Sequence, residues 1–146
     1  MSEINLSHMG KITLDEAFLR YPKATTFTFG DSEELCARLL TLVKEGSKRA
    51  TSMALTDVTI DGCPMPVVGR KDISLDWDGS PALVIETTSV SIQRFCDVKE
   101  TYALLEGENK DLRGWQEDHQ RYFERHGGFD PMMQLICEQF QLIEVF

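Results

Sequence analysis

The stretch Gly46-Ser47-Lys48-Arg49-Ala50-Thr51 decides how the chain is arranged, because an amphipathic helix runs into it and an apolar, strand-like run leaves it. Gly46 is well placed to end the helix, since glycine adopts the left-handed conformation without a Cβ penalty. Lys48 and Thr51 lie three residues apart across the resulting turn. We therefore expect an amine and a hydroxyl to face one cleft, and we look for chemistry here first.

The helix before this turn is marked by a capping pattern and an apolar face. Asp31 is its expected N-cap, with Glu34 three residues further on. Its apolar residues keep helical spacing: Leu35, Leu39, Leu42 and Val43. A shorter helix is predicted upstream, because residues 13–16 have the capping-box pattern. It should run to about Arg20, since Tyr21 precedes a proline and avoids helical angles.

After the turn the sequence favours strands. Residues 51–55 and 73–76 are short strand-like runs, and glycines and prolines interrupt the region between them. Asp78-Gly79 is a hairpin signal. The β-branched run over residues 82–90 predicts a long central strand, and the alternating later part of residues 135–146 predicts a final strand.

Two more helices are expected between these last strands. Asp97 is the expected cap of a helix that carries Val98, Tyr102 and Leu105, and Asp111 is the expected cap of the next. The second of these helices has an aromatic-rich side, ended by Gly127-Gly128: Leu112, Trp115, His119, Tyr122 and Phe123. The fold class that follows is α+β, with several short strands around a small sheet or barrel and helices covering its ends. One domain over residues 1–146 is expected, with residues 1–12 as a loose lead-in.

Composition limits the classes of function. The chain has 146 residues, of which 42% are hydrophobic, and 15 Lys plus Arg stand against 24 Asp plus Glu. The net charge of −9 opposes tight, non-specific binding to DNA or other long nucleic acid. No apolar run approaches a membrane span and no signal-peptide pattern is present, so a cytoplasmic protein is expected. A local excess of positive charge surrounds the central turn: Lys44, Lys48, Arg49, Arg70 and Lys71.

Neither a metal nor a cofactor is expected. The four cysteines show no CxxC spacing, which indicates reduced, structural thiols. His119 and His126 are seven residues apart, or about 10.5 Å along a helix, so they cannot share a metal. Neither a phosphate-cradling glycine loop nor a nucleophile elbow is present.

An ordered set of short motifs resembles the longer bacterial members of the ASCH domain family over about residues 25–145. The motifs are Phe29-Gly30-Asp31, Gly46-x-Lys48-x-Ala50-Thr51, Val84-Ile85-Glu86-Thr87-Thr88, Phe95-x-Asp97-Val98, Glu106-Gly107-Glu108 and Trp115-x-x-x-His119-x-x-x-Phe123. The family's fold is a small β-barrel related to the PUA domain, an RNA-binding module. The resemblance therefore implies a PUA-like barrel that binds RNA or a modified nucleoside in a cleft lined by Lys48, Thr51 and Glu108.

The resemblance also implies candidate catalytic roles. One short-form branch resembles an amidohydrolase that acts on an acetylated cytidine and uses a Lys, a Thr and a Glu. These roles would fall on Lys48, Thr51 and Glu108. Other members are reported as ribonucleases, so the hydrolase hypothesis divides between amide hydrolysis and RNA cleavage. The alternative is a non-catalytic RNA-binding module or a regulatory, protein-interaction module.

Each of these residues could instead have a purely structural role. Lys48, expected on a rim, and Thr51 could be a base and a nucleophile, or merely an exposed lysine and a strand threonine. Glu106 could bind substrate, or cap or brace the loop that carries Glu108. Trp115 could stack a base, although a core position suits its helix face better.

The remaining candidates are basic residues and one histidine. Arg49, Arg70 and Lys71 are the expected ligand-binding cations, for phosphate or carbonyl oxygens. His119 is expected to pack with Trp115 and Phe123 and to have a ring nitrogen satisfied by a neighbour.

Overall fold

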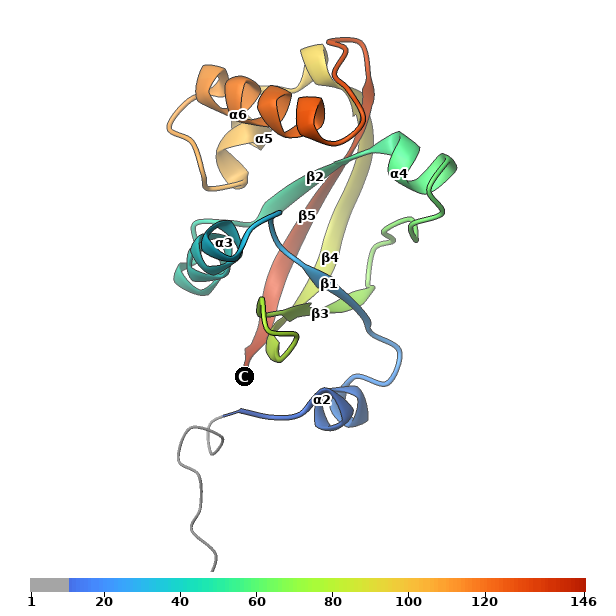
Figure 1. The fold of residues 1–146 in the computed structure, drawn as a ribbon, viewed down its shortest axis with the longest axis vertical. Coiled ribbons are helices and arrows are strands. Elements are labelled where there is room, and N and C mark those ends of the chain that lie inside the picture. Colours follow the sequence, from blue (N-terminus) through green and yellow to red (C-terminus); the bar gives the residue numbers. More distant parts are fainter. Residues whose placement is uncertain (1–10) are drawn as a thin grey trace, which may run out of the picture.

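Two long antiparallel strands form the axis of the fold in the computed structural model, which describes residues 11–146 (Figure 1). β4 (Pro81–Arg94) and β5 (Gln134–Val145) pair along almost their whole length. The register shifts between Val84 and Ile85 and again between Thr87 and Ser89. Such bulges bend and twist a strand pair, so the sheet curls. The predicted central strand and final strand are therefore both confirmed, and each is longer than predicted.

Three shorter strands complete one mixed sheet. β3 (Lys71–Leu75) pairs with β4, β1 (Thr25–Thr28) lies parallel to β3, and β2 (Ala50–Ala54) pairs with β5. The strand order is β1-β3-β4-β5-β2. The sheet is a curled half-barrel in which β1 and β2 are the edges, and the predicted α+β fold class is confirmed.

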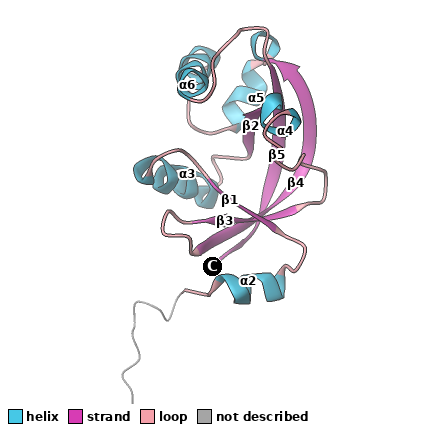
Figure 2. Ribbon diagram, turned by 45° about the vertical axis from the view of Figure 1, so that its right-hand side comes forward, coloured by secondary structure: helices cyan, strands magenta, loops and turns pink. Residues whose placement is uncertain are grey.

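Helices cover both ends of the curled sheet (Figure 2). They are α2 (Leu14–Arg20), α3 (Glu33–Glu45), α4 (Leu55–Thr59), α5 (Glu100–Leu105) and α6 (Leu112–Arg125). Figures 1 and 2 place α5 and α6 at one end, α2 at the other, and α3 between them. Among the described residues, no helix is long and apolar enough to cross a membrane.

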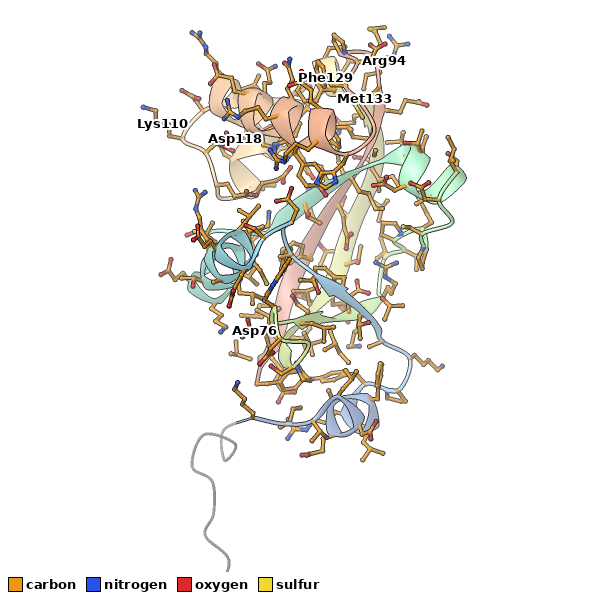
Figure 3. All side chains as sticks on the ribbon, viewed as in Figure 1. Asp76, Arg94, Lys110, Asp118, Phe129 and Met133 are labelled. Carbon is orange, nitrogen blue, oxygen red and sulfur yellow. The ribbon has the colours of Figure 1, made fainter. Side chains whose placement is uncertain are left out.

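Three clusters of buried side chains make up the core. One holds α5 and α6 against β2 and includes Trp115, Phe95 and Phe123. Figure 3 labels Phe129 and Met133, which pack against this cluster, beside α6 and the far ends of β4 and β5. A second cluster lies between α3 and the sheet, and a third lies beneath α2. The aromatic-rich end of the core therefore supports the helices that follow β4.

Two predicted helix caps are wrong. Ser32, not Asp31, is the N-cap of α3, and its side chain accepts a hydrogen bond from the Leu35 N–H. Asp31 instead binds Arg125 and His126 near the end of α6. Both serine and aspartate are good caps, so a neighbouring charge partner decides which of the two adjacent residues serves. Asp97 belongs to a short 3-10 helix, and Lys99 precedes α5 without a side-chain cap.

Other local signals are confirmed and some elements are new. Thr13 forms the predicted capping box, and Asp111 caps α6 by accepting the Gly114 N–H. The strand β1 and the helix α4 were not predicted, because the first is short and threonine-rich and the second has only five residues. The lead-in predicted for residues 1–12 falls, over residues 1–10, outside the described part of the chain.

Candidate functional site

The turn between α3 and β2 is held by its own backbone and by one arginine. Gly46 has φ of 94°, the left-handed conformation predicted for it. The Lys48 N–H donates to the Leu42 carbonyl at 3.1 Å. The Arg49 guanidinium donates to the carbonyls of Val43 and Lys48, at 3.0 and 2.9 Å. Arg49 therefore closes the C-terminal end of α3, where positive charge also suits the helix dipole.

A second turn, after α5, docks directly on the first. The Arg49 N–H donates to the Leu105 carbonyl at 2.7 Å. Gly107 has φ of 77°, and a Cβ added there would lie 2.9 Å from the Cα of Lys48 and closer still to the carbonyl of Ser47. Only glycine permits this approach. The close fit places the two flanking carboxylates, Glu106 and Glu108, around the Lys48 side chain.

Lys48 is buried, with 1% of its surface exposed, rather than on a rim as expected. Its Nζ donates to the carbonyls of Ala50 and Glu106 at 2.9 and 3.2 Å, and to Oε2 of Glu108 at 2.9 Å. Oε1 of Glu106 lies 3.6 Å from the same nitrogen. Because an ammonium has three N–H groups, every donor of Lys48 is matched to an acceptor. Lys48 is thus arranged as a buried cation between two carboxylates.

The Glu106 side chain, like that of Lys48, makes three hydrogen bonds. Its Oε2 accepts the Ser52 hydroxyl at 2.6 Å and the Trp115 indole N–H at 2.7 Å. Its Oε1 lies 3.2 Å from Nε2 of His119. Burial alone would raise the pKa of Glu106, but the positive charges and hydrogen bonds around it hold that pKa at about 2. Glu106 is therefore a fixed anion that braces the site.

His119 carries a proton on both ring nitrogens in this arrangement. Its Nδ1 donates to the Trp115 carbonyl at 2.8 Å, and its Nε2 faces the Glu106 carboxylate, which can only accept. Burial opposes the imidazolium, but the Glu106 charge outweighs it and raises the pKa of His119. The ring also stacks on Trp115, with centroids 4.1 Å apart. The predicted packing of His119 beside Trp115, with a satisfied nitrogen, is confirmed.

The predicted trio lines one cavity of about 310 Å³. Lys48, Thr51 and Glu108 all contribute to its wall. The Glu108 side chain is 16% exposed. Among the described residues, the Thr51 hydroxyl has no hydrogen-bond partner, so it is free to meet a ligand. Three arginines also line the cavity: Arg38, Arg121 and Arg125.

The other predicted binding residues lie elsewhere, except Glu106. Trp115 is fully buried behind Glu106, so its ring offers no face to a base. Arg49 is outside the cavity wall, in its helix-closing position. Arg70 is paired with Asp72 at 3.0 Å and Lys71 with Glu86 at 3.1 Å, both away from this cavity.

Sequence reasoning did not assign several residues of the cavity to the site. Ser52 follows Thr51 and bonds Glu106, while Tyr122 lies on α6, is 37% exposed and lines the cavity. Tyr122 is seven residues after Trp115, which places both on nearly the same helix face, so the helical period could have found it. Arg38 donates to the Glu108 carbonyl at 3.2 Å, a contact no local pattern indicates. Asp118, labelled in Figure 3 on α6, pairs with Arg121 at the same cavity.

The fold and the cavity together define a class of protein. A curled, open five-stranded sheet with helices at its ends holds a buried lysine between two carboxylates. The sequence profile of the ASCH domain matches residues 25–144, which is most of the chain. The chain belongs to the ASCH domain family, whose fold supports an RNA-binding role.

Solved structures agree with this family. An ASCH domain from Lactobacillus crispatus is 32% identical, with a TM-score of 0.78 over 87% of this chain and 84% of that one. Protein EF3133 from Enterococcus faecalis is 30% identical, with a TM-score of 0.79 over 90% and 85%. An ASCH protein from Zymomonas mobilis shares the fold, with a TM-score of 0.51 at 9% identity over 84% and 73%. Comparison with curated proteins found no significant match.

Proposed function

We propose that the chain binds RNA through one nucleoside unit, or binds a free modified nucleoside, in the cavity lined by Lys48, Thr51 and Glu108. The observation that carries the proposal is the convergence of these three side chains on one cavity of about 310 Å³. That volume is at the lower end of small-molecule pockets, about 300–1,000 Å³. It suits one nucleoside better than a longer strand.

The charges around the cavity support this ligand class. Lys48 and His119 balance Glu106 and Glu108 inside the site, so the interior is close to neutral. Each arginine on the same wall already bonds an acceptor but keeps further N–H groups for a phosphate, whose oxygens a guanidinium matches in geometry. Tyr122 offers a partly exposed ring on which a base can stack. The guanidinium groups therefore bring phosphate donors to this cavity, although the net charge of the chain is −9.

A second proposal is that the bound ligand is hydrolysed at an N-acyl group. The carboxylate of Glu108 takes the Thr51 proton as Oγ1 attacks the acyl carbon, and passes it to the leaving amine. Lys48 donates to Glu108 at the outset; once Glu108 has taken the proton, this N–H is released to stabilise the oxyanion, so Lys48 does not act as the base. Water then releases the acyl group as a carboxylic acid and regenerates the threonine. The observation that favours this order is the unpartnered hydroxyl of Thr51 in the wall that Lys48 and Glu108 share.

The binding proposal is tested by titrating the protein, at low salt, with nucleosides and with short single-stranded RNA. We expect saturable binding that Glu108→Gln weakens and Glu117→Gln does not. Glu117 is an exposed glutamate of α6 outside the cavity, so the two variants change the net charge equally. If the folded protein binds neither class of ligand, the binding proposal is overturned and a protein-interaction role takes its place.

The Thr51→Val variant separates a binder from a hydrolase, because valine keeps the β-branched shape and removes the hydroxyl. In a binder the affinity should fall by one hydrogen bond, about 0.5–1.5 kcal/mol or roughly tenfold. In a hydrolase the turnover of an N-acylated nucleoside should fall by orders of magnitude with little change in affinity. Cleavage of labelled RNA but not of DNA would instead identify a ribonuclease that uses the substrate's 2′-hydroxyl. Wild-type turnover by folded Thr51→Val would place the chemistry elsewhere.

A further inference from the structure

A second cavity, of about 390 Å³, lies next to the Lys48 cavity. The two share a wall that includes Thr51, Ser52 and Tyr122. Residues of both edge strands, β1 and β2, line the second cavity, so it occupies the open side of the half-barrel. Its remaining wall is largely apolar, with Phe27 and Ile136 among the contributors. A flat ring with polar edges fits a slot of this kind.

In the wall of this cavity, only one of the two oxygens of a buried carboxyl group accepts a hydrogen bond from the protein. Glu138 is 6% exposed, and its Oε2 accepts the Thr87 hydroxyl at 2.7 Å. Among the described residues, its Oε1 has no hydrogen-bond partner, although Glu138 lines the cavity. Burial raises the pKa of Glu138, and the nearby Arg70 charge opposes that rise. This oxygen is not among the fully buried, unpaired polar atoms of the described residues, so it is open to the cavity and can accept a hydrogen bond from a ligand there.

A positioned arginine faces the same space. Arg70 donates through Nε and Nη2 to Oδ2 of Asp72, at 3.1 and 3.0 Å. The buried Asp72 also accepts the Thr25 hydroxyl, so the carboxylate that holds Arg70 is itself fixed. The Nη1 group of Arg70 has no partner among the described residues. Glu138 and Arg70 therefore present an acceptor and a donor to the cavity, which the Asp57 carboxyl group also lines.

The register of the sheet connects this cavity to the proposed ligand site. Glu138 on β5 is directly opposite Thr51 on β2. Opposite residues of an antiparallel pair project from the same face with Cβ atoms about 4.5–5.5 Å apart. Thr51 lines both cavities, so a ligand that reaches Thr51 from the Lys48 side arrives beside Glu138.

We propose that the second cavity is a nucleobase subsite, in which Glu138 accepts a hydrogen bond from the exocyclic amine of a base and Arg70 donates to an acceptor of that base. This inference rests on the proposed function and names its ligand as two successive nucleotides of single-stranded RNA. One base occupies the Lys48 cavity and its neighbour occupies the second. A base with a carbonyl in place of the amine would place its oxygen against the Glu138 carboxylate oxygen, and two acceptors cannot form a hydrogen bond.

The test compares CpC with UpU, because cytosine and uracil differ at the ring position that carries the amine. Affinities of the two dinucleotides and of cytidine are measured for the wild type, Glu138→Gln and the charge-matched control Glu117→Gln. We expect the wild type to bind CpC at least about tenfold more tightly than either UpU or cytidine. Glu138→Gln should abolish both advantages and leave cytidine binding unchanged, while Glu117→Gln should behave as the wild type.

The failures of the two proposals are distinguishable. If the protein binds cytidine and CpC with equal affinity, the subsite is overturned and the proposed function stands. The same holds if Glu138→Gln changes the two affinities equally. Absence of binding by every probe to the folded protein overturns both. Glutamine keeps the size of the side chain and an acceptor for Thr87, so folding should be retained. Met53→Phe, which narrows only the second cavity, gives an independent variant and should remove the same CpC advantage.

Discussion

Two carboxylates of one short turn have opposite environments, and Lys48 lies between them. On the buried side, Glu106 is 2% exposed and is bound by Ser52, Trp115 and His119. On the open side, Glu108 bonds Lys48 and remains partly exposed to the cavity. The difference indicates a division of roles. Glu106 fixes where the lysine lies, whereas Glu108 is the carboxylate that a ligand can meet.

The largest expected effect comes from removing the buried carboxylate. Glu106→Ala leaves the Lys48 and His119 charges buried without their shared partner, which should cost about 3–5 kcal/mol of unfolding free energy. Glu108→Ala should cost less, about 1–2 kcal/mol, since it removes one charge-assisted hydrogen bond near the surface. Urea unfolding of both variants beside the wild type measures the contrast. Equal losses, or a larger loss in Glu108→Ala, would refute the division of roles.

A smaller effect is expected from the donor behind Glu106. Trp115→Phe keeps most of the aromatic packing and removes the indole N–H that Glu106 accepts. The expected loss of unfolding free energy is about 1–3 kcal/mol, from the weakened bonding of a buried carboxylate. Because the indole N–H acts through Glu106, its part of the loss should vanish in the Glu106→Ala background, which leaves only the packing cost of a smaller ring at a fully buried position. Full additivity of the two changes in a double-mutant cycle would show that they are independent.

The smallest expected effect is a pH dependence of stability. The pKa of His119 is raised in the folded state, so its contribution is complete below its ordinary pKa of 6.5 and is lost as pH rises through the folded value. The pKa of Glu106 is lowered to about 2, so its contribution is complete above its ordinary 4.5 and is lost as pH falls. The site should therefore be most stabilising between about pH 4.5 and 6.5. Thermal unfolding against pH measures this, and His119→Gln should flatten the alkaline side of the profile; an unchanged profile would contradict the charged histidine.

The sequence predicted the parts of the site that depend on local chain geometry. Gly46 and the Asp111 cap are signals read within one turn of helix, and the β-branched run of β4 is long enough to be unambiguous. The choice between Asp31 and Ser32 was not accessible in this way, because it depends on Arg125 and His126 from a distant helix. No sequence pattern indicated that Asp31 and the end of α6 lie close together in space.

The roles within the site show the same limit. Arg70 and Lys71 have the same positive charge as the basic residues of the central turn. Their position at the start of β3 nevertheless places them away from the Lys48 cavity. The burial of Lys48, and the difference between Glu106 and Glu108, arise only when the turn after α5 docks on the turn before β2. A pattern can indicate that a lysine and two glutamates are candidates, but packing decides which of them is braced and which is free.

The fit of Gly107 against Ser47 has a consequence for recombination between related domains. Glu106 follows Lys48 by 58 positions, so a single crossover readily separates the two turns into different parents. Their contact leaves no room for a Cβ, so the two backbones must match closely. Chimaeras that inherit both turns from one parent should retain the lysine's surroundings, while those that mix them must re-create the match by chance. The two turns, distant in the gene, should therefore work only as a matched pair.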